Sequence, residues 1–144
     1  MKSMMTNQYI EFEVSGEKYA ISISDIHEII RMQDITDIPN CQHYVQGVIN
    51  LRGKVVAVIS LSALFAVPAR EPDKFTRIVV VSHQEESVGI IVDKVNKVTA
   101  FSDIQPPPDR VVGVNGAYFT GIGLTENGLV GILKLTEVLL REYG

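Results

Sequence analysis

Apolar and polar residues alternate over several stretches of the chain, which is the pattern of β-strands that bury one face. The alternation is clear over residues 10–14 and again over residues 19–23. Residues 47–61 predict two strands joined by a tight turn at Arg52-Gly53-Lys54, because glycine tolerates the positive φ angles of such turns. The chain is therefore expected to be mostly β.

Polar residues between the apolar runs predict further turns and a few short helices. Asn127-Gly128 predicts a second hairpin, and Glu85-Glu86 is expected at the tip of a third. Ser24 is expected to cap a helical turn over residues 24–30. Thr136 is expected to cap a closing helix over residues 137–143.

The two halves of the chain resemble each other, which indicates an internal repeat. Residues 19–23 align with residues 88–92 at an offset of 69 positions, and a later series aligns at an offset of 74. Tyrosines, glycines and prolines match as well as aliphatic residues. The matched pairs are Ile26/Val95, Ile29/Val98, Ile35/Ile104 and Pro39/Pro108, then Tyr44/Tyr118, Gly47/Gly121, Val48/Ile122, Val55/Leu129, Val58/Ile132, Ile59/Leu133, Leu61/Leu135 and Leu64/Val138.

The change of offset predicts about five extra residues in the second copy, between Asp109 and Ala117. A copy of roughly 70 residues is close to the lower limit for independent folding, so the copies are expected to share buried surface. Residues 1–144 therefore predict a single domain with approximate repeat halves 9–66 and 77–140, between which strands can cross. Two small β-barrels around a common core fit this pattern.

Composition narrows the class of protein. The net charge of −4 in 144 residues argues against a nucleic-acid partner. Cys41 is the single cysteine, and an intracellular, reducing compartment is expected. The longest uncharged stretch, residues 55–69, is shorter than the roughly 20 residues of a membrane span, and no basic amphipathic helix predicts direct membrane binding. A cytoplasmic protein is expected.

Enzyme and cofactor motifs are poorly matched. Gly47, Gly53 and Lys54 have the wrong spacing for a phosphate-binding loop, and Val55 stands where that loop has a hydroxyl. Gly121-Ile122-Gly123 lacks the third glycine of a dinucleotide fingerprint. The histidines at positions 27, 43 and 83 show no metal-ligand spacing. No catalytic residue, cofactor or metal is therefore assigned.

Two charged residues stand in apolar surroundings. Glu28 is flanked by isoleucines, and Arg52 lies at the predicted hairpin tip. If the fold brings them together, they form a charge-assisted pair. The alternative is that each is separately solvated. Arginine is also common among binding hot spots, so Arg52 is suited to an interface.

Two segments carry a resemblance to a known family: Ile38-Pro39-Asn40 and residues 45–56, Val-Gln-Gly-Val-Ile-Asn-Leu-Arg-Gly-Lys-Val-Val. Together with residues 19–30, 88–93 and 119–123, these resemble the signature of CheW-type chemotaxis coupling proteins, in family order from Tyr9 onward. The same module occurs as the regulatory domain of the chemotaxis histidine kinase CheA.

The resemblance implies a non-enzymatic adaptor built of two SH3-like five-stranded barrels with a shared apolar core. Its partners would be the CheA regulatory domain and the cytoplasmic tips of chemoreceptors, at arrays on the inner face of the membrane. By position, the resemblance assigns kinase binding to Gly47, Asn50, Leu51 and Arg52. It assigns a receptor-binding groove between the barrels to Ile26, Glu28, Ile30 and Val88.

The chain departs from the family pattern at two positions. The family has proline and then aspartate in the strand after the hairpin, where this chain has Ala57 and Ser60. An acidic contact or cap at Ser60 is expected to be lost. A paralogous scaffold or kinase regulatory module in another signalling array remains an alternative, and a small-ligand domain that uses the groove as a pocket is a remote one.

Overall fold

The structure is a computed structural model that describes residues 7–139. Its strands are β1 (Tyr9–Val14), β2 (Glu17–Ser22), β3 (Ile26–Arg31), β4 (Val45–Leu51), β5 (Lys54–Ser60), β6 (Arg77–His83), β7 (Glu86–Val92), β8 (Lys94–Thr99), β9 (Ile104–Gln105), β10 (Arg110–Val111), β11 (Val114–Asn115), β12 (Phe119–Thr125) and β13 (Gly128–Leu133). The helical elements are short: η2 (Ile23–Asp25), α1 (Leu61–Phe65), η3 (Gly116–Tyr118) and α2 (Leu135–Val138).

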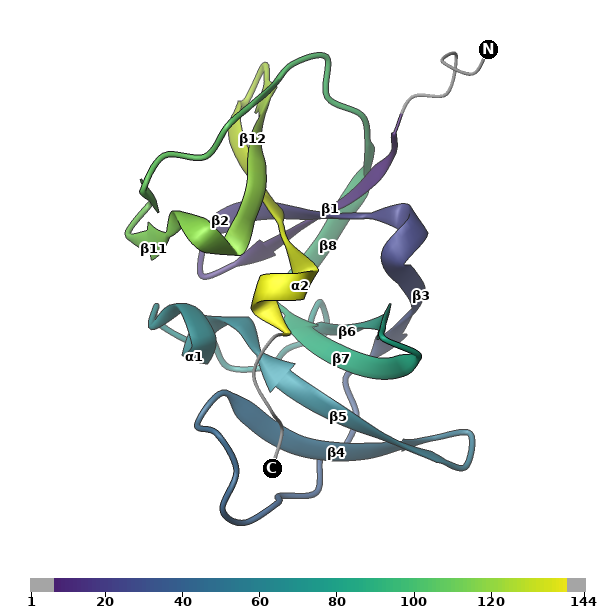
Figure 1. Ribbon diagram of the computed structural model, residues 1–144. Coiled ribbons are helices and arrows are strands. Elements are labelled where there is room, and N and C mark those ends of the chain that lie inside the picture. Colours follow the sequence, from purple (N-terminus) through teal and green to yellow (C-terminus); the bar gives the residue numbers. More distant parts are fainter. Residues whose placement is uncertain (1–6, 140–144) are drawn as a thin grey trace.

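The strands form two curved sheets that lie one above the other, with α1 and α2 beside their contact (Figure 1). The six-stranded sheet has the order β8-β1-β2-β13-β12-β9, and the five-stranded sheet has the order β3-β6-β7-β5-β4. Neighbours are antiparallel except for the pairs β2/β13 and β5/β7, which are parallel. The prediction of a mostly β fold is confirmed.

Each sheet combines strands from both halves of the chain. The β1–β2 hairpin joins strands of the second half, and the β6–β7 hairpin joins strands of the first half. At the offsets of 69 and 74, β1, β2, β3, β4 and β5 become β6, β7, β8, β12 and β13, and the order of one sheet becomes that of the other. The two sheets are therefore related by the internal repeat, with their central hairpins exchanged.

The edges of the two sheets are also connected in equivalent ways. Thr36, on the chain that leaves β3, exchanges two backbone hydrogen bonds of 2.9 Å with Val48 of β4. The repeat-equivalent pair, Gln105 and Ile122, joins β9 to β12. The β10–β11 hairpin lies where the extra residues of the second copy are predicted, and it has no counterpart in the first half.

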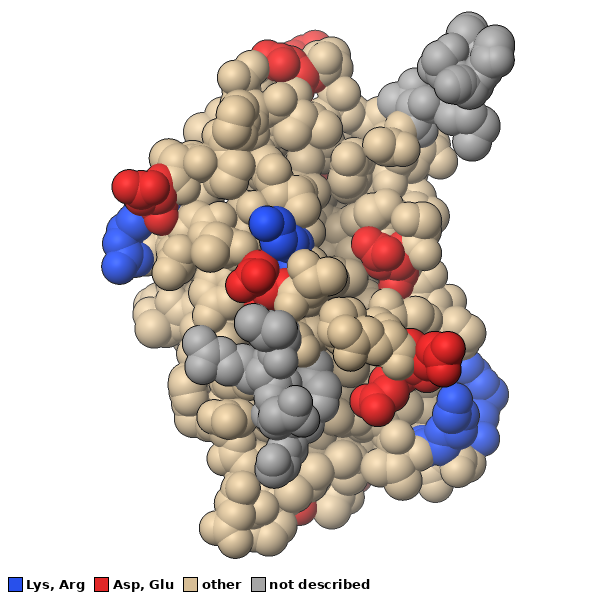
Figure 2. All heavy atoms as spheres, in the orientation of Figure 1, with Lys and Arg blue, Asp and Glu red and all other residues tan. Residues whose placement is uncertain are grey.

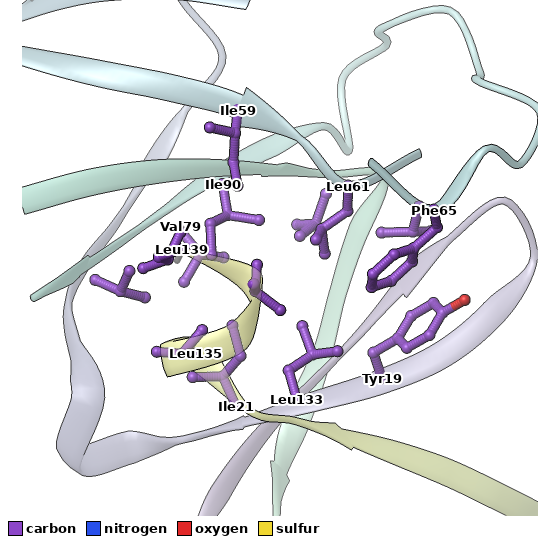
Figure 3. Packing of buried hydrophobic residues seen from close by; sticks show 14 of the residues in the cluster. Tyr19, Ile21, Ile59, Leu61, Phe65, Val79, Ile90, Leu133, Leu135 and Leu139 are labelled. Carbon is purple, nitrogen blue, oxygen red and sulfur yellow. The ribbon is translucent and has the colours of Figure 1, made fainter. Parts of the chain in front are cut away.

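Burial follows the alternation of the strands. In β6, Val79 and Val81 point to a core shared by the two sheets, whereas Ile78 and Val80 point to the inner core of the five-stranded sheet. The shared core takes residues from both sheets and from both α-helices, and Figure 3 shows α2 placed among them. A smaller inner core in the six-stranded sheet comprises Tyr9, Ala20, Phe101, Val130 and Ile132.

Two predicted helices differ from the structure. Residues 26–31 form β3 rather than a helix capped by Ser24, because their side chains alternate between the two faces of a sheet. Thr136 lies inside α2, whose N-cap is Lys134, so Thr136 is not the cap. Residues 140–143 of that predicted helix lie outside the described residues.

Candidate functional site

The tip of the β4–β5 hairpin is a tight, hydrogen-bonded turn. Leu51 pairs with Lys54, and the two residues between them, Arg52 and Gly53, have φ angles of 51° and 87°. Two successive positive φ angles are those of a type I′ turn, which matches the twist of a hairpin. The backbone N–H of Gly53 donates to Asn50 Oδ1 at 2.8 Å. Asn50 therefore holds the turn that presents Arg52.

Arg52 donates a hydrogen bond to the carboxylate of Glu28 on β3, and the two groups form an ion pair. The Arg52 side chain is 67% exposed and that of Glu28 is 23% exposed. The hydrogen bond from Arg52 holds the pKa of Glu28 below its ordinary value, and the carboxylate raises the pKa of Arg52. The predicted pair is formed, and because it is solvated it orients the hairpin tip more than it stabilises the fold.

A β-bulge at His27 separates the predicted receptor-groove residues. Ile26 pairs with Val81, whereas Glu28 pairs with Val80, the adjacent residue. A one-residue shift moves the following side chains to the other face of the sheet. Ile26 thus packs against the shared core, and Ile30 packs against the inner core of the five-stranded sheet. The structure does not bring Ile26 and Ile30 into one groove.

Ile26 and Val88 instead belong to a cross-strand row on the face that looks toward the other sheet. Each of the five strands gives one residue, and each residue is the register partner of the next. Such partners lie side by side on one face. We call this set the apolar row: Ile26, Val81, Val88, Ala57 and Val48. Val88 is only 2% exposed, but the two ends of the row are half-buried.

The apolar row opens to solvent at its β4–β5 end. Val55, two residues from Ala57 on the same face of β5, is 76% exposed. A hollow of about 370 Å³ lies there, lined by Val48, Val55 and Ala57 and rimmed by Lys54, Glu85 and Glu86. Figure 2 shows acidic and basic side chains gathered side by side near the tips of these hairpins. Sequence reasoning assigned neither Val48 nor Val55 to the site. Val48 alternates with the buried Gly47 and Ile49 on β4, and Val55 precedes the buried Val56 on β5.

The predicted kinase-binding residues have different roles in the structure. Gly47 is buried, has φ 145°, and a Cβ there would lie 2.0 Å from the carbonyl oxygen of Thr36. Glycine is therefore required at position 47 by the backbone conformation and by the lack of space for a Cβ atom. Leu51 packs partly against the inner core. Asn50 and Arg52 are exposed, and Arg52 places a positively charged guanidinium at the hairpin tip.

The two departures from the family pattern also have locations. Ala57 stands in the apolar row, between Val88 and Val48. Ser60 is the N-cap of α1, and its Oγ accepts a hydrogen bond from the backbone N–H of Ala63 at 3.2 Å. The expected loss of an acidic cap at Ser60 does not leave α1 uncapped, because the Ser60 hydroxyl is the acceptor.

Within residues 7–139, no three His, Cys, Asp or Glu side chains are grouped so as to hold a metal ion. None of the helices in that part of the chain has the length and apolar character needed to cross a membrane. Among the histidines, the Nε2 atom of His43 lies 3.2 Å from the carbonyl oxygen of Ala63.

Comparison with known proteins identifies the family. The model of the CheW-like domain matches residues 8–142. The chain belongs to the CheW family. CheW of Helicobacter pylori (strain ATCC 700392 / 26695) is 36% identical over 138 residues, which cover 94% of this chain and 83% of the relative. CheW of Bacillus subtilis (strain 168) is 36% identical over 135 residues, covering 92% and 86%.

A solved CheW structure has the same fold. The scaffolding protein TtCheW from Thermoanaerobacter tengcongensis superposes with a TM-score of 0.85 at 34% identity, covering 91% of this chain and 86% of that one. The CheW resemblance is thus confirmed, as is a mostly β fold of two related sheets. Both curated relatives carry the name of a chemotaxis protein, and the solved one is described as a scaffold.

Proposed function

We propose that the chain is a non-enzymatic adaptor that couples the cytoplasmic tips of chemoreceptors to the histidine kinase CheA. The chain would act at receptor arrays on the inner face of the membrane. The observation that carries the proposal is the open end of the apolar row beside the Glu28–Arg52 pair. An exposed apolar patch next to fixed charges is typical of a protein interaction site.

The kinase surface is the β4–β5 hairpin. Arg52 supplies an exposed guanidinium, and Asn50 and Gly47 hold the backbone that presents it. Val55 supplies apolar area on the same hairpin. An arginine beside an exposed aliphatic side chain combines the two contact types that dominate binding energy. Leu51 supports this surface from the inner side.

The receptor surface is the β3 end of the same sheet. Ile26 is half-buried on the face between the sheets, where a helical tip would lay an apolar stripe, and the buried Val88 supports this face from the same row. Glu28 and Ile30 lie on the other face of β3, so they would act at its edge rather than inside this groove. Signal transfer requires a difference in affinity between receptor states, because equal affinity shifts no equilibrium.

The direct test is calorimetric titration of the chain with the CheA regulatory domain. Val55→Glu is expected to weaken binding at least about tenfold, because it places a charge in an apolar contact. Leu129→Glu is the matched control, since Leu129 is the repeat-equivalent residue on β13 and is 66% exposed. It is expected to leave the affinity within about twofold.

Four outcomes contradict the proposal. The first is a wild-type chain that does not bind the kinase domain at tens of micromolar. The second is equal loss in Val55→Glu and Leu129→Glu. The third is a metabolite that co-purifies stoichiometrically in the hollow, which favours a small-ligand domain. Binding to the kinase domain without any response to receptor tips favours a regulatory module of another array.

A further inference from the structure

A basic patch with an exposed aromatic ring lies away from the site described above. It comprises residues from the turn before β6, from the adjoining ends of β3 and β6, and from the start of β8: Arg31, Lys74, Phe75, Arg77 and Lys94. The Phe75 ring is 48% exposed. The Nζ atoms of Lys74 and Lys94 lie 5.3 and 5.7 Å from its centroid, within the range of cation–π contact.

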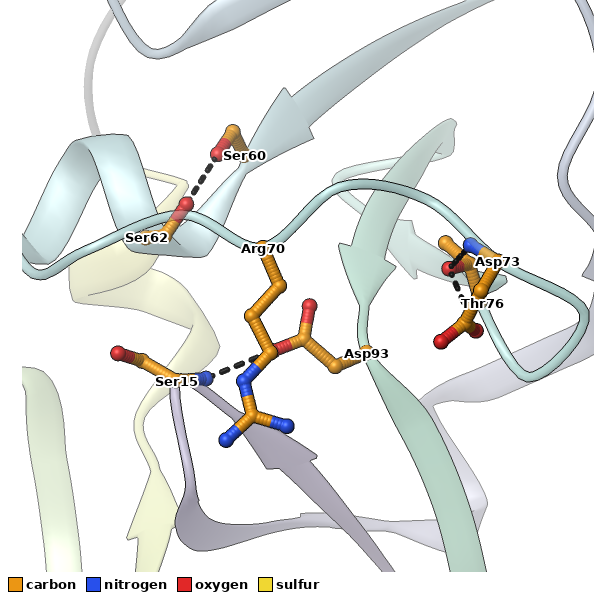
Figure 4. Close-up of polar contacts among 7 residues, drawn as sticks. All are labelled: Ser15, Ser60, Ser62, Arg70, Asp73, Thr76 and Asp93. Carbon is orange, nitrogen blue, oxygen red and sulfur yellow. Dashed lines mark hydrogen bonds and ion pairs between the residues drawn. The ribbon is translucent and has the colours of Figure 1, made fainter.

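The turn that carries Phe75 is fixed by its own hydrogen bonds. The backbone N–H of Phe75 donates to Asp73 Oδ1 at 2.8 Å, and that of Asp73 donates to Thr76 Oγ1 at 2.8 Å. Thr76 is buried, so its hydroxyl fixes the turn to the interior of the protein (Figure 4). An aromatic ring held in this way loses little conformational entropy on binding.

Two arginines of the patch face each other across the sheet. Arg31 is the register partner of Arg77, and like charges in that position destabilise a strand pair. Arg77 Nη1 donates to the carbonyl oxygens of Lys74 and Thr76, both at 2.9 Å, which leaves its other donors for a ligand. A hollow of about 290 Å³ lies between Arg31, Lys74 and Arg77.

Nearby carboxylates offset these cations only in part. Asp73 lines the hollow, and its Oδ1 accepts the hydrogen bond that closes the turn. Glu13 is the register partner of Lys94. Asp93 Oδ2 accepts from the backbone N–H of Ser15 at 2.7 Å and lies 4.0 Å from Arg70 Nε (Figure 4). The four cations of the patch therefore outnumber these three carboxylates, on a chain whose net charge is −4.

The internal repeat shows that the β-fold does not need the two facing arginines. At the offset of 69, Arg31 corresponds to Ala100 and Arg77 to Gln8. These two residues adjoin β8 and β1, which pair in the six-stranded sheet without an arginine at either position. Lys94 lies at the start of β8, so the basic patch spans both sheets, and its pair of facing arginines is present in only one of them.

The geometry points to a docking site for an acidic peptide segment of a partner protein, in which an aliphatic or aromatic side chain packs on Phe75 between flanking carboxylates. Carboxylates complement Arg31, Lys74, Arg77 and Lys94, and arginine pairs with them bidentately. The site is separate from the apolar row and from Arg52, and it does not depend on the adaptor function proposed above.

The test is fluorescence anisotropy with a labelled peptide of glutamates around one central phenylalanine, and with the same peptide carrying glutamine for glutamate. The wild-type chain is expected to bind the acidic peptide, more weakly as salt rises, and not the glutamine peptide. Lys74→Glu is expected to weaken binding about tenfold and Phe75→Ala about threefold. Lys97→Glu, an equal charge change at an exposed lysine of the same strand as Lys94, is the control and is expected to change it less than about twofold.

Since all three variants are at exposed positions, circular dichroism should show unchanged folding. Equal binding of both peptides, or equal loss in Lys74→Glu and Lys97→Glu, overturns the proposal. Binding to vesicles of anionic lipid without binding to the acidic peptide also overturns it, in favour of a membrane surface.

Discussion

The two sheets share the order of their five equivalent strands. They differ in charge at two equivalent positions, one on the edge strand β3 or β8 and one at the tip of the β4–β5 or β12–β13 hairpin. In the five-stranded sheet, Glu28 of β3 meets Arg52 at the β4–β5 tip. The equivalent residues of the six-stranded sheet are Lys97 and Glu126, so the signs are reversed. Lys97 and Glu126 instead line a hollow of about 720 Å³. The strand order therefore forms with either arrangement of charges, and the Glu28–Arg52 ion pair is a feature of the five-stranded sheet.

The two sheets also differ in how far the row of side chains on their facing sides is covered. The apolar row of the five-stranded sheet has an exact register equivalent in the six-stranded sheet, from Val95 through Phe12 and Tyr19 to Gly131 and Ile122. Ile122 is buried, whereas its equivalent Val48 is half-exposed. Phe119 covers the six-stranded row, since a Cβ on Gly131 would lie 2.6 Å from its ring. One row is closed by the chain itself, and the other is open to solvent at Val48 and Val55.

The inner cores differ by one buried carboxylate. Val80 in the five-stranded sheet corresponds to Glu11 in the six-stranded sheet, which is buried and accepts a hydrogen bond from Asn96 Nδ2 at 2.8 Å. Asn96 is the bulge residue of its sheet, and the equivalent bulge residue, His27, is exposed. A buried carboxylate is tolerated only where such a donor is present.

The largest expected effect comes from moving that carboxylate to the other sheet. Val80→Glu should destabilise the chain by about 4 kcal/mol, because no donor of the Asn96 kind faces it. Glu11→Gln keeps an acceptor for Asn96 and should cost less than about 1 kcal/mol. Urea unfolding monitored by circular dichroism measures both. Equal midpoints would show that the two inner cores do not differ in this way.

The next largest difference is expected between alanine substitutions at Gly47 and at its repeat equivalent, Gly121, where another segment of the chain lies close to the glycine. Gly47→Ala should cost about 3 kcal/mol, because the position combines positive φ with a backbone clash. Gly121→Ala should cost less, about 2 kcal/mol, because Gly121 is not among the glycines with positive φ and a Cβ there would lie 3.0 Å rather than 2.0 Å from the nearest backbone oxygen, that of Gln105. The same unfolding experiment compares them, and a larger cost at Gly121 would contradict the difference.

The helix caps give a smaller difference. Ser60→Ala removes the side-chain cap of α1 and should cost about 1 kcal/mol. Lys134, the equivalent residue before α2, makes no side-chain cap, so Lys134→Ala should cost less than about 0.5 kcal/mol. Thermal unfolding of the two variants distinguishes them. If both lose the same stability, the Ser60 hydroxyl contributes nothing as a cap.

The smallest effect concerns the pH dependence of the Glu28–Arg52 pair. Arg52→Ala should raise the pKa of Glu28 toward its ordinary value of 4.5, because the hydrogen bond from Arg52 is the largest cause of the lowering. Since the folded pKa lies below the unfolded one, the pair contributes above the unfolded pKa and is lost as pH falls through the folded pKa. Carboxyl-detected NMR titration measures the shift. An unchanged Glu28 titration would show that the contact is absent in solution.

Much of this architecture could be predicted from the sequence, for physical reasons. The repeat predicted two related units with a shared core. Arg52-Gly53 and Asn127-Gly128 correctly marked hairpin turns, because glycine accepts the positive φ angles found at Gly53 and Gly128. The β3 strand was missed because serine before an apolar run is also typical of a helix cap. The grouping of Ile26 with Ile30 failed because a bulge at His27 depends on strand pairing and leaves no local signal.

The site was predicted in part. The Glu28–Arg52 contact was one of two alternatives that the sequence left open, because the residues are 24 positions apart and only the fold brings them together. The apolar row could not be predicted, because it needs the register of four strand pairs, one of them parallel and between halves. Gly47 was assigned to binding by resemblance, whereas its contact with Thr36 shows a requirement of the backbone.

The central claim is that the five-stranded sheet couples receptor to kinase, and the most direct measurement is CheA autophosphorylation with receptor tips, CheA and this chain combined. Wild type should make the kinase rate depend on the receptor tips. Arg52→Ala should lose most of this dependence, and the repeat-equivalent Glu126→Ala should retain it. A rate that ignores the wild-type chain, or that falls equally with both variants, would contradict the account.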